Sequence, residues 1–156
     1  MKRVIYILVA IVICFGVGYS AQLFQTESIE VWYPTLDKSS LTPPNWVFPI
    51  VWSIIYICCG LSIGLAWDKE KMLDTGLGWI FIIQLIFNFS WSFLFFYLQD
   101  PVSGLVDIIL LDFSVAFYTI ICYKINKLAA WLYMPYILWL VLATYLNIYI
   151  VINNPI

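Results

Sequence analysis

Long uncharged runs, made mainly of apolar residues, alternate along the chain with short charged segments. The uncharged runs cover residues 4–26, 39–67, 75–99 and 128–156. A further run over residues 101–123 is interrupted only by Asp107 and Asp112. Because a helix needs about 20 apolar residues to cross a bilayer, each run is long enough for one crossing. The pattern predicts an all-α membrane protein with five transmembrane helices, near residues 4–24, 46–67, 77–98, 102–123 and 130–152.

The composition supports the same class. Of 156 residues, 64% are hydrophobic and 10% are charged, and the mean hydropathy is +0.97, whereas about 25% of residues are charged in soluble domains. The first run follows Lys2 and Arg3 as in a secretory leader, but it exceeds the usual apolar core of about 7–15 residues, so we expect a retained helix. Short connections favour one bundle, a single domain over residues 1–156.

The distribution of lysine and arginine predicts the orientation. With the N-terminus inside, the inner segments hold Lys2, Arg3, Lys69, Lys71, Lys124 and Lys127, and the outer segments hold only Lys38. Basic residues concentrate in the cytoplasmic segments of membrane proteins. We therefore expect a multi-pass protein of a bacterial plasma membrane, with its N-terminus inside, its C-terminus outside and the long loop over residues 25–45 outside.

Several function classes are excluded by what the sequence lacks. The net charge is −2, with no basic patch to contact phosphates, so we expect no nucleic-acid partner. Histidine, the commonest general base and metal ligand, is absent. The cysteines lie inside predicted helices, where they behave as small hydrophobic residues. We expect no metal site, no resident cofactor and no conventional set of catalytic residues.

The segment from Trp32 to Tyr56 concentrates aromatic residues around Pro43 and Pro44, directly before an apolar run. Tryptophan and tyrosine favour the membrane–water boundary, where the ring is apolar and its N–H or O–H finds polar partners. Paired prolines end one element and suit the start of the next. The long first loop is therefore expected to act as a lid over a cavity for a flat apolar ligand. An ordinary interfacial belt of aromatics is the alternative.

Inside the predicted helices, large rings share faces with amides or small residues. These faces hold Trp52 and Tyr56; Gln84, Asn88, Trp91 and Phe95; and Pro135, Trp139, Ala143 and Asn147. Polar side chains that face lipid are costly, so they are expected to point into the bundle. Together the faces predict a pocket with aromatic walls and a few polar anchors. A helix–helix seam whose amides bond to each other is the alternative.

Two acids and a glycine pair add further expectations. Asp112 lies near mid-span, where an aspartate costs on the order of 3 kcal/mol to insert. It is expected to hydrogen-bond a neighbouring helix or to serve proton or ligand passage. Asp107 lies one turn from the outer end and is expected to reach the headgroup region. Gly60 and Gly64 allow close helix packing, either within one subunit or at a dimer seam.

These residues resemble the translocator protein/tryptophan-rich sensory protein family, also called the peripheral benzodiazepine receptor family, over almost the whole chain. The shared motifs are Trp32-Tyr33 with Leu36 and Lys38, Pro43-Pro44-x-Trp46-Val47-Phe48, Val51-Trp52 with Tyr56, Asn88-x-x-Trp91-Ser92 with Phe95-Phe96, and Pro135-Tyr136-x-x-Trp139 with Ala143-Thr144 and Leu146-Asn147. The departures are Ser39, where the family usually has proline, and Leu41, where an aromatic residue is common.

The resemblance implies a five-helix bundle, commonly a homodimer, that binds tetrapyrroles such as protoporphyrin IX and benzodiazepine-type compounds. Its pocket residues correspond here to Tyr33, Pro43, Trp46, Trp52, Asn88, Trp91, Trp139 and Ala143. We expect a porphyrin receptor or sensor, with the porphyrin as ligand rather than cofactor.

In this interpretation the macrocycle stacks on Trp52 and Trp139. Asn88 bonds a polar edge of the macrocycle, and Ala143 leaves room for the ring. Two alternatives remain. One is an enzyme that degrades porphyrin with light and oxygen, in which Trp52 and Trp139 supply or quench radicals. The other is a transporter of porphyrins or small apolar molecules.

Overall fold

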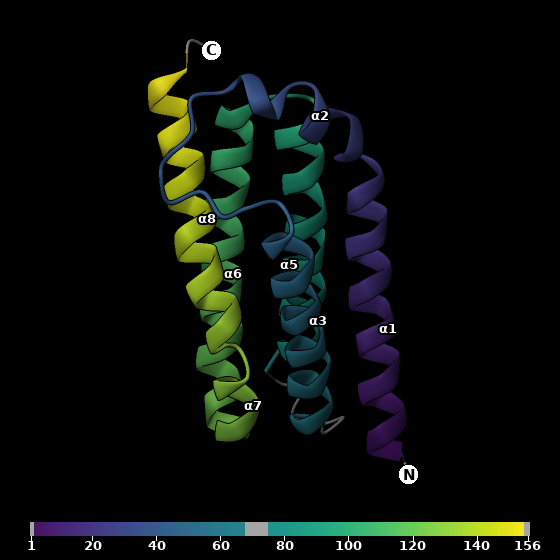
Figure 1. Cartoon of the computed structure of the whole chain (residues 1–156). Coiled ribbons are helices and arrows are strands. Elements are labelled where there is room, and N and C mark those ends of the chain that lie inside the picture. Colours follow the sequence, from purple (N-terminus) through teal and green to yellow (C-terminus); the bar gives the residue numbers. More distant parts are fainter. Residues whose placement is uncertain (1, 68–74, 155–156) are drawn as a thin grey trace.

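The computed structural model describes residues 2–67 and 75–154. Long helices lie side by side with their axes close to parallel (Figure 1). They are α1 (Lys2–Leu23), α3 (Val47–Leu65), α5 (Leu77–Ser92) with its π-helical continuation η2 (Phe93–Tyr97), α6 (Pro101–Ile125) and α8 (Met134–Asn153). Shorter helices are α2 (Thr26–Glu30), η1 (Tyr33–Thr35) and α7 (Lys127–Trp131). Among the described residues there is no strand, and five helices are long and apolar enough to cross a membrane, which confirms the predicted all-α fold.

Local sequence explains where the later helices begin. Asp100 caps α6 by accepting hydrogen bonds from the backbone N–H groups of Val102 and Ser103, and Pro101 in the first turn has no N–H to leave unpaired. The last span was predicted as one helix over residues 130–152. The structure instead has a break at Leu132 and Tyr133 between α7 and α8, because the next turn begins with a proline, which suits a helix start better than a helix interior.

Neighbouring helices contact each other in the order α3, α1, α5, α6 and α8, and α8 returns to α3 to close the ring. The α1–α3 seam depends on the predicted glycine pair. A Cβ atom on Gly60 would lie 2.8 Å from the backbone nitrogen of Ile11, and one on Gly64 would overlap the side chain of Ile7. The pair therefore serves packing within one chain, the first of the two alternatives.

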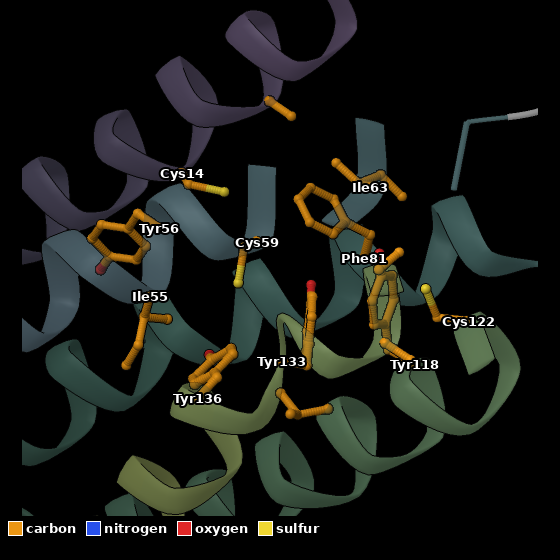
Figure 2. Close-up of a cluster of buried hydrophobic side chains, with 14 of the residues drawn as sticks. Cys14, Ile55, Tyr56, Cys59, Ile63, Phe81, Tyr118, Cys122, Tyr133 and Tyr136 are labelled. Carbon is orange, nitrogen blue, oxygen red and sulfur yellow. The ribbon is translucent and has the colours of Figure 1, made fainter. Parts of the chain in front are cut away.

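The half of the bundle nearer the N-terminus is filled by aromatic rings and thiols. Figure 2 shows Tyr118, Tyr133 and Tyr136 in a row, with ring centroids 4.2 Å and 6.0 Å apart. Their hydroxyls need partners in an apolar medium. Tyr118 pairs with Ser62 at 3.1 Å, and Tyr133 accepts a hydrogen bond from Gln84. This packing closes one half of the bundle and places open space in the other.

The two intramembrane acids both face neighbouring helices. Asp112 accepts a hydrogen bond from Thr144 Oγ1 on α8 at 2.8 Å, as expected for a structural bond between helices. Asp107 was expected to reach the headgroup region, and this prediction is wrong. Its side chain is 6% exposed and accepts a hydrogen bond from Ser90 Oγ on α5 at 2.6 Å. Rotation about the helix axis directs this carboxyl toward α5 rather than outward.

The loop between α1 and α3 crosses the end of the bundle where the C-terminus lies. It then descends along α8 and crosses to the start of α3 (Figure 1). Two polar contacts tie its first part to the end of α5: Gln25 Nε2 donates to Ser92 Oγ at 2.6 Å, and Ser28 Oγ donates to the carbonyl of Phe96. The loop therefore has a defined path over the open half of the bundle.

Candidate ligand-binding cavity

A cavity of about 430 Å³ lies in the half of the bundle covered by this loop. This size is within the range of about 300–1,000 Å³ typical of small-molecule sites. The walls come from α1, the loop, α3, α5 with η2, and α8. The lining residues are Phe15, Gly18, Tyr19, Ala21, Gln22, Gln25, Ile29, Tyr33, Asn45, Phe48, Pro49, Trp52, Ser53, Tyr56, Asn88, Trp91, Ser92, Phe95, Phe96, Ala143, Leu146, Asn147 and Ile150.

The wall formed by α3 presents a pair of stacked rings. Trp52 and Tyr56 lie one helical turn apart, with ring centroids at 5.5 Å and planes inclined by 28°. Behind them, Tyr136 of α8 meets the Trp52 ring edge-on at 5.9 Å. Such offset and edge contacts are favoured by the charge distribution of aromatic rings. The Trp52 indole is therefore held in a fixed plane against the cavity.

The wall formed by α5 widens into a π-helical turn. The N–H of Leu98 bonds the carbonyl of Phe93, five residues back, and the turn brings the consecutive residues Phe95 and Phe96 both to the interior. Phe95 stacks on Trp91 with centroids 5.2 Å apart. π-Helical turns are rare and frequent at functional sites. Here the turn places three rings on one side of the cavity.

Asn88 links rings on two other helices. Its Oδ1 accepts a hydrogen bond from the Tyr56 hydroxyl at 3.4 Å, and its Nδ2 donates to the Tyr136 hydroxyl at 3.2 Å. An amide has two N–H donors and two acceptor lone pairs. Each amide atom therefore keeps one position that these two bonds do not use, while the protein fixes the orientation of the group.

Asn147 fixes the second tryptophan of the cavity. Its Oδ1 accepts from Trp91 Nε1 at 3.1 Å, and its Nδ2 donates to the carbonyl of Pro101 at 2.8 Å. Gly104 lies close to this group. A Cβ on Gly104 would be 3.2 Å from Phe95 and 3.4 Å from Asn147 Oδ1. A side chain at this position would press on Phe95 and come into van der Waals contact with Asn147.

The loop contributes Tyr33 to the lining. Its buried ring meets Phe96 edge-on, with centroids 5.6 Å apart. Burial raises the pKa of the Tyr33 phenol above its usual value, so the group stays neutral at physiological pH. Among the lining residues that the structure describes, none carries a formal charge. The polar side-chain groups of these residues are amides, hydroxyls and indole N–H groups.

Exposed lining residues mark where the cavity opens. Phe15, Tyr19 and Gln22 of α1 are exposed, as are Asn45 and Pro49 at the start of α3. Figure 1 shows the chain crossing from the loop to the start of α3 at the level of the later turns of α1. The opening therefore lies between α1 and the chain that enters α3.

The predicted site residues fall into three groups. Tyr33, Trp52, Asn88, Trp91 and Ala143 are brought together around the cavity. Trp139 lies behind the wall and, with Ala143, lines a separate small void of about 30 Å³. The Phe48 ring meets the Trp139 ring edge-on, with centroids 5.4 Å apart. Pro43 and Trp46 line neither space, and Trp46 is 66% exposed.

Sequence reasoning missed the contribution of α1. Gly18 and Gln22 lie on one face of its last turns, Gln25 follows just after the helix, and all three line the cavity. A Cβ on Gly18 would overlap the Tyr56 ring, so this glycine allows the Tyr56 ring of α3 to pack against α1. One small residue and two amides near the end of the first apolar run could have indicated this contribution, because the predicted cavity faces of the other helices combine the same kinds of residue.

Comparison with known proteins identifies the relatives of this chain. The TspO/MBR family matches residues 10–152. The "Tryptophan-rich protein TspO" of Archaeoglobus fulgidus is 35% identical over 152 residues, which cover 97% of this chain and 99% of the relative. The protein of the same name from Chlorobaculum tepidum is 35% identical and covers 99% of both. The human "Translocator protein" is 34% identical over 74% of this chain and 70% of its own.

The family match and these relatives, on a bundle of five apolar helices, agree with the resemblance carried by the tryptophan and proline motifs. The chain is a multi-pass membrane protein and belongs to the TspO/MBR family.

Proposed function

We propose that this protein is a membrane receptor or sensor that binds a tetrapyrrole in the cavity, with protoporphyrin IX as the expected ligand. The observation that carries the proposal is the cavity itself: its described lining is uncharged, and Trp52 and Trp91 form two of its walls in fixed orientations. A flat apolar macrocycle presents large faces to such rings. Benzodiazepine-type compounds, which are also aromatic and largely apolar, would occupy the same space.

Each wall has a distinct role in this proposal. The macrocycle stacks on Trp52 and Trp91, and Ala143 leaves room at the α8 side. The unused positions on the Asn88 amide bond a polar edge of the ligand. Trp139 supports the wall from behind through Phe48 rather than stacking on the ligand. The opening between α1 and α3 lets an apolar ligand enter sideways from the bilayer.

We also propose the orientation given by the basic residues, in a bacterial plasma membrane. Lys124 and Lys127 lie at the end of α6 and the start of α7, opposite the loop that carries Lys38. Lys69 and Lys71 lie outside the described residues. In this orientation the cavity and its loop, acting as a lid, are on the outer side. Association into a homodimer is part of the proposal.

Titration of the purified protein with protoporphyrin IX in the dark, followed by fluorescence, tests the proposal. Saturable binding to the parent and weaker binding to Ala143→Leu, which fills the cavity, are expected. No saturable binding would refute it. Binding with ligand loss and new products under illumination would instead identify a degrading enzyme, and net flux into sealed liposomes would identify a transporter.

A further inference from the structure

The uncharged lining restricts where an acidic group of a ligand can sit. An ionised carboxylate is costly to bury unless it is paired, and the described cavity residues offer no cation. A ligand with carboxylate substituents must therefore keep them at an edge of the cavity, in water or against a cation of the loop. Within residues 25–45 the sequence has one basic residue, Lys38, against the acids Glu27, Glu30 and Asp37.

Lys38 contacts the ring of Tyr33, which lines the cavity. Its Nζ is 4.7 Å from the ring centroid of Tyr33, within the range of a cation–π contact. Tyr33 itself lines the cavity and packs against Phe96. The ammonium is thereby held beside the cavity wall rather than extended into solvent, and Lys38 makes no ion pair among the described residues.

The residues on both sides of Lys38 are hydrogen-bonded to α8 or to Asn154 at its C-terminal end. The N–H of Asp37 donates to Asn154 Oδ1 at 2.8 Å, and Asn154 Nδ2 donates back to the Asp37 carbonyl at 3.0 Å. On the other side, Ser39 Oγ and the Tyr145 hydroxyl are 3.2 Å apart. Ordering a free lysine costs side-chain entropy. Here the flanking bonds and the Tyr33 ring have already restricted the side chain.

We propose that Lys38 is an anion-recognition residue at the edge of the cavity that Tyr33 forms beside α8, where it pairs with a carboxylate substituent of a ligand whose flat apolar body occupies the interior. This inference rests on the proposed tetrapyrrole-binding function and specifies its ligand class as acidic rather than neutral macrocycles. The surrounding acids repel a carboxylate elsewhere on the loop, so the position of Lys38 also selects the orientation in which the ligand enters.

The test compares protoporphyrin IX, which has two carboxylates, with its uncharged dimethyl ester. Both are titrated in the dark against the parent, Lys38→Gln, Lys38→Arg and Lys127→Gln. Lys127 is the matched control because its Nζ lies 5.6 Å from the Tyr123 ring, away from the cavity. We expect Lys38→Gln to weaken binding of the acid by about 3- to 10-fold and to leave the ester unchanged, with Lys38→Arg restoring most of the affinity.

Salt provides a second readout. Binding of the acid to the parent should weaken as ionic strength rises, and this dependence should be smaller in Lys38→Gln. Equal weakening of acid and ester in Lys38→Gln would show that Lys38 only supports the Tyr33 ring, and an unchanged affinity for the acid would show no role. Either result overturns the inference while porphyrin binding stands. Failure of the parent to bind either porphyrin would refute the proposed function and this inference with it.

Discussion

The substitution Asn147→Leu tests whether one buried amide holds the cavity wall together. Asn147 is 1% exposed, accepts from Trp91 Nε1 at 3.1 Å and donates to the carbonyl of Pro101 at 2.8 Å. Leucine has nearly the same shape and can make neither bond. The change therefore leaves the indole N–H without an acceptor in an apolar environment.

The magnitude follows from the two lost bonds. A buried donor left unpaired costs about 1–3 kcal/mol in proteins, and hydrogen bonds between membrane helices average about 0.6 kcal/mol with a maximum near 1.7. We expect Asn147→Leu to lower the free energy of unfolding by about 1–3 kcal/mol. Because Trp91 stacks on Phe95 at 5.2 Å, release of the indole should also weaken porphyrin binding.

The assay is reversible unfolding of the purified protein in mixed detergent micelles, compared with Asn153→Leu. Asn153 lies on the same helix and donates to the carbonyl of Tyr149 at 2.8 Å from an exposed position, so its loss should cost less than about 0.5 kcal/mol. Equal stability of Asn147→Leu and the parent would show that the Trp91 bond does not contribute, and the reasoning about the wall would fail.

Two further predictions concern packing and pH. Gly60→Val should lower the free energy of unfolding by about 1–3 kcal/mol, because its Cβ would lie 2.8 Å from the backbone nitrogen of Ile11. Gly16→Val should change stability little, because a Cβ at Gly16 would have no atom within 4 Å. Similar thermal midpoints for the two variants would contradict the α1–α3 seam. Hydrogen bonds from Ser103 hold the pKa of Asp100 below its usual value. The contribution of Asp100 to stability is therefore complete above about pH 4 and is lost as pH falls further. The parent should lose more stability on acidification than Asp100→Asn, and parallel pH profiles of the two proteins would count against the helix cap.

The spans could be predicted from sequence because the bilayer imposes length and polarity together. About 20 predominantly apolar residues are needed for each crossing, and five segments of the chain satisfy this, one of them despite Asp107 and Asp112. The faces that line the cavity followed from helical spacing, since Trp52 and Tyr56 were expected to share a face one turn apart, and the structure shows their rings stacked there. Residues a turn apart share a face whatever the tertiary contacts are.

Tertiary contacts decided what the sequence did not. Trp139 shares a helical face with Ala143 but lies one turn closer to the filled half, where Phe48 covers it. The π-helical turn at Phe93–Tyr97 depends on contacts such as the bond from Ser28 to Phe96, which join segments far apart in the chain. Asp107 shows the same limit, since spacing along one helix does not specify its rotation toward α5.

Porphyrin affinity of Trp52→Ala against Trp67→Ala tests the location of the binding site most directly. Trp52 lines the cavity, whereas Trp67 stacks on Tyr6 at the other end of the bundle, with centroids 4.2 Å apart. Stacking of a base on an aromatic side chain is worth about 1–3 kcal/mol, and about 1.4 kcal/mol is tenfold in affinity. Protoporphyrin IX should bind Trp52→Ala about tenfold or more weakly than the parent and bind Trp67→Ala unchanged. Equal affinity of both variants and the parent, with folding confirmed, would contradict a porphyrin site in this cavity.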